Sequence, residues 1–339
     1  MYSEAELDEA VAAGALTPAD AAALRGFADA RRSTPHIDEE EFRLITSFND
    51  IFVALAIVIL LVAVAGITGA LTPLLTGPAI AATAWYLALF FTARRGMALP
   101  SIILLFAFVG GLSSGIAAVG AGPIFASIVA AGAAYGHWRK FRVPITPAAG
   151  AAALVSLLVA VVGSLTGDAN RFGTMLLLTT LVGGLATFAL AMWWDASDPS
   201  RVSRRSDVAF WLHLLAAPLI VHPIFWLTGL AKGSSDVGGA VAVLAMYAAM
   251  SIVALAIDRR ALLVSALVYV LWALGNLLFQ FGSLGTAIPL TALVIGSALL
   301  LLSAFWHKAR RGVVMLLPAE WRRHLPYLDR PTARAAAEA

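Results

Sequence analysis

Residues 51–71 read IFVALAIVILLVAVAGITGAL, and this stretch contains no charged side chain. A helix needs roughly 20 apolar residues to cross the hydrocarbon core of a bilayer, so the stretch predicts a membrane-spanning helix. Similar runs follow with short connections, which makes consecutive helices antiparallel. The ten predicted spans are 51–71, 76–93, 99–119, 122–138, 147–166, 174–194, 208–230, 237–257, 261–282 and 286–306.

The composition of the whole chain agrees with that stretch. Of the 339 residues 60% are hydrophobic and 13% are charged, and the mean hydropathy is +0.87. A typical soluble domain has about 25% charged residues. The composition excludes a water-soluble enzyme, a disordered protein and a fibrous protein. It predicts an all-α, polytopic integral membrane bundle of about ten transmembrane helices.

Cysteine is absent from the chain, which excludes disulfides, thiol nucleophiles and cysteine-ligated metals. The formal net charge is +3. Its placement indicates membrane topology, so we expect membrane lipids as partners and no nucleic acid.

The basic residues collect on one side of the predicted membrane. The odd-numbered connections hold only Arg171 and Lys232, and the other 21 of the 23 Lys and Arg lie at the two ends or in the even-numbered connections. The positive-inside rule then places both termini in the cytoplasm, in a bacterial inner membrane. Because the first 50 residues lack a basic segment leading into a short apolar core, we expect no cleaved signal peptide.

Three regions follow from this threading. Residues 1–46 form a small cytoplasmic helical hairpin and an acidic linker, with a helix stop at Gly14 and a new helix start at Thr17. Residues 47–307 form the transmembrane domain. Residues 308–339 form a basic amphipathic tail suited to the inner membrane interface.

The N-terminal pattern also resembles a known architecture. It consists of a short hairpin, a charged spacer and many helices with short loops, and its quoted positions are Leu7, Gly14, Ala15, Leu16, Thr17, Ala21 and Leu24. This resembles the uncharacterised bacterial polytopic membrane proteins of the DUF2157 type. The resemblance implies a fold and supplies no activity.

Charged side chains are missing from the middle of every predicted span, which argues against proton-coupled carriers and pumps. Polar residues of the third, seventh and ninth spans nevertheless reach a similar depth, in the outer third of the membrane. Such groups should meet each other, water or a ligand. The predicted ligand-binding residues are Ser113, Ser114, Thr180, His213, His222, Asn276 and Gln280.

The two histidines of the seventh span leave alternatives open. His213 and His222 could hydrogen-bond in the interior, handle a substrate or a proton, or ligate a metal or haem. Nine residues of separation place them on opposite faces of a straight helix, so no metal and no cofactor is assigned. Pro218 predicts a kink between them.

The segment Gly111–Gly115 matches the G-x-S-x-G pattern of serine hydrolases, and its glycines also form GxxxG. The hydrolase pattern needs a strand–turn–helix elbow, whereas this segment lies within a predicted helix. Close packing of the third and fourth spans, which carry Gly111, Gly115, Gly132 and Gly136, is the alternative explanation.

Three functions remain open from the sequence. The first is binding or transport of a small solute or lipid through a polar pocket in the outer half of the bundle. The second is a non-catalytic membrane subunit or regulator that binds a cytoplasmic protein partner through its cytoplasmic ends. The third is an intramembrane serine hydrolase that uses Ser113 or Ser114 with His222. No catalytic residue is assigned, and the oligomeric state is left open.

The topology can be tested by labelling, since the chain has no native cysteine. Ser235→Cys lies in a predicted outer connection and should react with an impermeant maleimide added outside spheroplasts. Labelling from the cytoplasmic side alone would contradict the predicted topology.

Overall fold

The computed structural model describes residues 10–23, 48–167, 169–198, 203–229 and 237–260, with shorter stretches and single residues between 262 and 325. The chain divides into two compact units. One unit is Met1–Glu41 with Tyr327–Ala339, and the other is Phe42–Pro326.

In the first unit, residues 10–23 contain the turn that the sequence predicts. Gly14 has a φ of +70°, which glycine tolerates, and its amide donates to the Val11 carbonyl at 3.0 Å. The Asp20 amide donates to Thr17 Oγ1 at 3.1 Å, which caps the helix that follows. The remainder of the predicted hairpin lies outside the described residues, so the hairpin as a whole stays a prediction.

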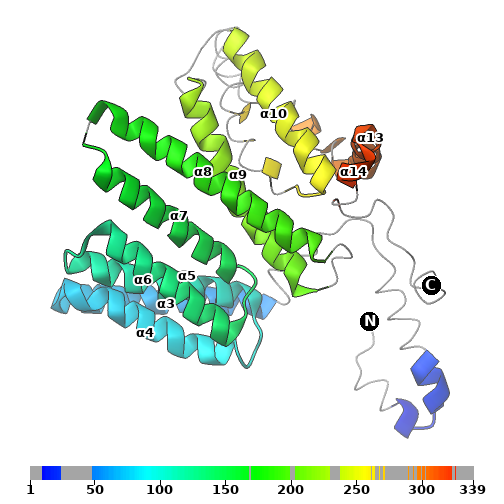
Figure 1. The fold of residues 1–339 in the computed structure, drawn as a ribbon. Helices are drawn as coiled ribbons and strands as arrows, with labels where there is room; N and C mark the ends of the chain where they lie inside the picture. Colours follow the sequence, from blue (N-terminus) through cyan, green and yellow to red (C-terminus); the bar gives the residue numbers. More distant parts are fainter. Residues whose placement is uncertain are drawn as a thin grey trace. The chain divides into compact units, whose positions relative to one another are not determined.

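Regular structure in the described part of the second unit consists of helices (Figure 1). These are α3 (Phe48–Leu71), α4 (Pro73–Phe91), α5 (Ala98–Ala118), α6 (Gly122–Phe141), α7 (Thr146–Leu165), α8 (Ala169–Ala196), α9 (Arg204–Leu227), α10 (Val237–Ile257), α13 (Trp306–Leu316) and α14 (Ala319–Arg322). Helices α3 to α10 fall on the first eight predicted spans. Most of 261–282 and 286–306 lies outside the described residues, so the count of ten stays a prediction.

Six described helices, namely α3, α4, α5, α7, α8 and α9, are long and apolar enough to cross a membrane. Their outer surfaces are apolar as well. Ile59, Val62 and Leu165 each expose more than half of their side-chain surface. Large exposed apolar surfaces are rare on soluble monomers and are expected where lipid covers the protein. The all-helical class is therefore confirmed for the described residues, and the six apolar helices support a membrane protein.

Proline fixes where three of the helices begin. Pro73, Pro123 and Pro147 each stand at the first or second helical position, where a missing N–H costs nothing. The second span therefore starts at Pro73, earlier than the predicted residue 76, and Gly77 and Pro78 lie inside α4.

From α3 to α9, helices that follow one another along the chain pack side by side. Helix α3 contacts α4 and α5, α5 contacts α6, and α9 contacts α7 and α8. Small and branched residues fill these contacts. The α3–α5 core contains Ile57, Leu61, Ala84, Ala88 and Leu104, and the α7–α9 core contains Ala148, Ala191, Val208 and Leu212.

Glycine brings α4 and α5 into backbone contact. A Cβ on Gly111 would lie 2.7 Å from the Gly77 carbonyl oxygen, and a Cβ on Gly77 would lie 2.5 Å from the Gly111 carbonyl oxygen. Gly115 in turn faces Pro78. Close packing thus explains the GxxxG of α5, as expected, but the partner is α4 rather than α6. Gly132 and Gly136 of α6 have no atom within 4 Å of an added Cβ.

A second pair of glycines lies between two neighbouring helices. A Cβ on Gly183 of α8 would meet Val155 of α7 at 2.8 Å, and a Cβ on Gly184 would meet Leu219 of α9 at 2.8 Å. Adjacent helical residues point about 100° apart, so the two glycines serve different neighbours. Helix α8 therefore approaches α7 and α9 at the same height.

The α4–α5 contact provides a matched pair of substitutions. Gly111→Ala should lower the apparent melting temperature of the detergent-solubilised protein, because the new Cβ meets backbone atoms that cannot move aside. The neighbouring Gly110→Ala enters open space and improves helix propensity, so it should be neutral or stabilising. Tryptophan fluorescence can monitor the thermal unfolding of both variants. Equal melting temperatures would contradict this contact.

Candidate functional site

The serines of the predicted pocket are bonded within their own helix. Ser113 Oγ donates to the Gly110 carbonyl at 3.1 Å, and Ser114 Oγ donates to the Gly111 carbonyl at 3.0 Å. Their helix, α5, packs mainly on α3, α4 and α6. Such local bonds satisfy a hydroxyl in lipid without any partner from another helix.

The pocket residues of α8 and α9 belong to a different set of neighbours. Thr180 Oγ1 donates to the Leu176 carbonyl at 2.8 Å. The His222 side chain is exposed and its ring lies 6.1 Å from that of Trp226. Helix α9 packs mainly on α7 and α8. Since Asn276 and Gln280 lie outside the described residues, the ligand-binding assignment stays a prediction.

His213 matches one of the alternatives that the sequence left open. Its side chain is fully buried, and Nδ1 lies 2.8 Å from the Ala209 carbonyl oxygen, which can only accept a hydrogen bond. Its ring meets Phe188 of α8 edge to face, with 5.3 Å between ring centres. His213 thus lies in the α8–α9 contact with Nδ1 paired to the Ala209 carbonyl, and the ligand-binding role predicted for it stays a prediction. Pro218 lies five residues after His213 in α9 and is exposed.

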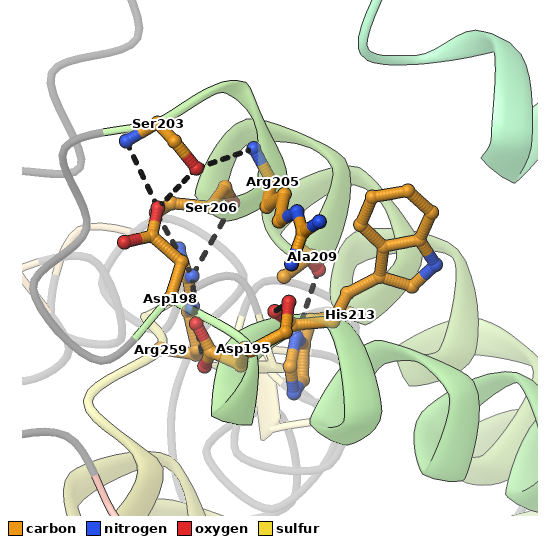
Figure 2. Close-up of polar contacts among 10 residues, drawn as sticks. Asp195, Asp198, Ser203, Arg205, Ser206, Ala209, His213 and Arg259 are labelled. Atoms are coloured by element: carbon orange, nitrogen blue, oxygen red, sulfur yellow. Dashed lines mark hydrogen bonds and ion pairs between the residues drawn. The ribbon is translucent and has the colours of Figure 1, made fainter.

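The most strongly built polar site among the described residues lies elsewhere, where α8 ends, α9 begins and α10 ends. Arg259 is 2% exposed and Asp195 is 3% exposed. Arg259 Nη2 donates to Asp195 Oδ1 at 2.5 Å, and Nε donates to Oδ2 at 3.3 Å. Figure 2 shows the guanidinium and the carboxylate facing each other from distant parts of the sequence. This two-point geometry is the strongest form of an ion pair.

The start of α9 contacts this ion pair through Ser206. Arg259 Nη2 also donates to the Ser206 carbonyl and to Ser206 Oγ, both at 3.3 Å. Just before the helix, Asp198 accepts hydrogen bonds from the Ser203 amide at 2.9 Å and from Ser203 Oγ at 2.6 Å (Figure 2). Ser203 is the N-cap of α9 and accepts from the Arg205 amide. The cap and the ion pair together fix the α8–α9 connection.

The residues on either side of Arg259 attach the C-terminal helix α13. The Trp306 indole N–H donates to Asp258 Oδ1 at 2.8 Å, and Arg310 Nε lies 3.6 Å from the same oxygen. The Arg260 guanidinium lies 4.9 Å from the centre of the Trp306 ring. Asp258 has a φ of +58°, which turns the chain sharply after α10. We call Asp195, Ser206, Asp258, Arg259, Arg260, Trp306 and Arg310 the Arg259 hub.

Burying charge is costly, so the hub has to satisfy its ions completely. Removing a charged group from water costs several kcal/mol, and attraction offsets that cost only when the remaining polar atoms are also bonded. Arg259 Nε donates to Asp195 Oδ2, and the two N–H groups of Nη2 are shared among Asp195 Oδ1, the Ser206 carbonyl and Ser206 Oγ. Within the described part of the chain, no group of three or more His, Asp or Glu could hold a metal ion. The contacts of the hub join four segments, namely the ends of α8 and α10, the start of α9, and α13.

The pairing of Arg259 with Asp195 was not predicted from the sequence. Arg259 and Arg260 are two of the 21 basic residues that indicated topology, and no role was assigned to Asp195 or Asp258. A usable signal was present, because acidic and basic residues end successive spans on the same predicted side. That signal cannot say which carboxylate meets which cation.

The hub predicts an asymmetric set of stabilities. Arg259→Met leaves Asp195 buried without its cation and should cost about 3–5 kcal/mol. Combining it with Asp195→Leu should recover much of the loss, because the second change removes the stranded charge. Arg205→Met, at an exposed position nearby, is the matched control. A melting temperature for Arg259→Met equal to that of Arg205→Met would show that the pair contributes nothing.

Known proteins give no further guidance on this chain. No family model matches it, and the searches of curated proteins and of solved structures found no significant match. The function therefore has to be argued from the residues themselves.

Proposed function

We propose that the chain is a multi-pass protein of the bacterial inner membrane with ten spans and both ends in the cytoplasm. The support is the distribution of basic residues described above, together with the six apolar helices. Exposed cations gather near the ends of α4 and α6 and the start of α9, at Arg94, Arg95, Arg139, Lys140, Arg142, Arg204 and Arg205. The last two spans, 261–282 and 286–306, rest on the sequence alone.

We further propose that the protein is a non-catalytic membrane subunit or regulator that binds a protein partner at its cytoplasmic ends. One observation carries this proposal, namely the Arg259 hub. The hub joins α13, the helix that begins the predicted C-terminal tail, to the ends of α8 and α10 and to the start of α9. A costly buried network at this place favours a defined orientation of the cytoplasmic segment, which a partner surface requires.

Transport through an outer pocket draws less support. Ser113 and Ser114 are hydrogen-bonded to their own helix, and the His222 side chain is exposed. That proposal now depends on Asn276 and Gln280. An intramembrane hydrolase would need Ser113 or Ser114 of α5 next to His222 of α9. These two helices have different main neighbours, since α5 packs on α3, α4 and α6 and α9 packs on α7 and α8.

Photocrosslinking in the native membrane tests the partner proposal. Benzoylphenylalanine at the exposed positions Ala19 and Ala319 should give discrete protein adducts, whereas the exposed Val119, on the predicted outer side, should give none. The Ala319 adduct should disappear with Trp306→Phe, which removes the indole N–H that binds Asp258 and leaves a smaller aromatic ring in its place. Membrane levels of the variants serve as the folding control. Equal adducts from Val119, or adducts unaffected by the hub substitution, would contradict the proposal.

A further inference from the structure

Helix α13 has two chemically different faces. Trp306, Arg310 and Val314 are spaced four residues apart and are all buried. Spacing of four residues places side chains on one face of a helix. That face packs on a core that includes Ala254, Leu255 and Ile257 of α10.

The Arg259 hub fixes which way α13 is turned. Asp258 holds both Trp306 and Arg310, which lie one helical turn apart on the buried face. Arg260 covers the Trp306 ring. Two anchors on one face determine the rotation of the helix about its own axis, so the opposite face is determined too.

The opposite face mixes exposed apolar and basic side chains. Leu316 is 88% exposed and Met315 is 58% exposed, and Phe305, just before the helix, is half exposed. Lys308 and Arg311 are exposed on the same side, and Lys308 Nζ lies 5.5 Å from the centre of the Phe305 ring. At about 100° per residue, positions 308, 311, 315 and 316 share one arc of the helix. Residues 306–316 contain no acidic side chain.

The side chain of Arg322 caps the C-terminal end of α13, which suits a surface with little water. Arg322 donates from Nε to the Leu317 carbonyl at 2.8 Å and from Nη2 to the Met315 carbonyl at 2.6 Å. The last carbonyls of a helix lack intrahelical partners, and leaving them bare away from water is costly. A guanidinium there supplies both the hydrogen bonds and a favourable charge.

We propose that this outer face of α13, made by Phe305, Lys308, Arg311, Met315 and Leu316, docks on the bilayer surface and recognises anionic phospholipid headgroups. The apolar side chains enter the boundary between headgroups and acyl chains, while Lys308 and Arg311 meet lipid phosphates. The absence of acidic residues on α13 makes its charge complementary to an anionic leaflet. The inference rests on the proposed function for the cytoplasmic position of this helix and adds the partner of its outer face.

The full-length protein in nanodiscs tests the inference, since single cysteines can be placed freely in this chain. Leu316→Cys carries an environment-sensitive fluorophore, and the nanodiscs contain phosphatidylcholine alone or with phosphatidylglycerol. Ser197→Cys, exposed in the α8–α9 connection, is the aqueous control, and Val62→Cys, exposed on α3, is the lipid control. The Leu316 label should be quenched by nitroxide-labelled lipid and shielded from iodide, more strongly with phosphatidylglycerol.

Removing charge should weaken docking without unfolding the helix. Lys308→Gln takes away one attraction to the anionic surface and should lower the ratio of docked to undocked label about fivefold. Iodide quenching of the Leu316 label equal to that at Ser197 in both lipids would overturn the proposal. Shielding from iodide without quenching by labelled lipid would also overturn it, because a protein surface would then cover the face.

The two proposals fail in different ways. Cytoplasmic labelling of Ser235→Cys, or the absence of crosslinked partners, would count against the proposed topology or function. An aqueous Leu316 label in correctly oriented protein would count only against lipid docking.

Discussion

The bilayer interior offers no water to polar groups, and this constraint governs the rest of the structure. Every backbone amide and carbonyl in a span has to be bonded within its own helix. Several side-chain hydroxyls follow the same rule. Thr68, Thr187 and Ser251 each donate to the carbonyl four residues earlier. These hydroxyls are satisfied locally, which removes the pressure for them to gather in one pocket, whereas Thr76 Oγ1 of α4 is buried without a hydrogen-bond partner.

Helix association under this constraint depends on shape. Lipid tails are as apolar as leucine side chains, so contact between helices gains little from the hydrophobic effect. Close approach and dispersion contacts take its place. Gly77 and Gly111 let the backbones of α4 and α5 approach where a Cβ would collide. Gly183 and Gly184 likewise make room for Val155 and Leu219. These contacts join α4 to α5 and α8 to both α7 and α9.

Charge is confined to the helix ends, where it is used to join segments. Arg259 is held by Asp195 and Ser206, and the residues beside it hold Trp306 and Arg310. One short stretch after α10 thus orients both the α8–α9 connection and α13. The proposed cytoplasmic function and the proposed lipid contact both depend on this joint, because it sets which face of α13 is turned outward.

The sequence by itself determined the membrane class and the positions of the helices. Span length and hydropathy are properties of one segment at a time, and eight of the predicted spans coincide with α3 to α10. Local signals were also readable, such as Pro at helix starts and Gly14 at a turn. Which helices pack against one another was harder to predict from the sequence. The glycines of α5 were expected to face α6 and instead face α4. The sequence could not decide this, because a residue that contacts lipid and a residue that contacts another helix are equally apolar.

Only the tertiary structure decided which polar groups meet. Equal depth suggested a pocket with Ser113, but depth says nothing about rotation around the helix axis, and its hydroxyl bonds to Gly110. The sequence used the charge of Arg259 only as a sign of which side of the membrane it lies on. Its pairing with Asp195 depends on how the ends of α8 and α10 are brought together. Hydropathy along a chain is one-dimensional, while contacts between helices depend on azimuth and on neighbour identity, and these are fixed only when the helices pack.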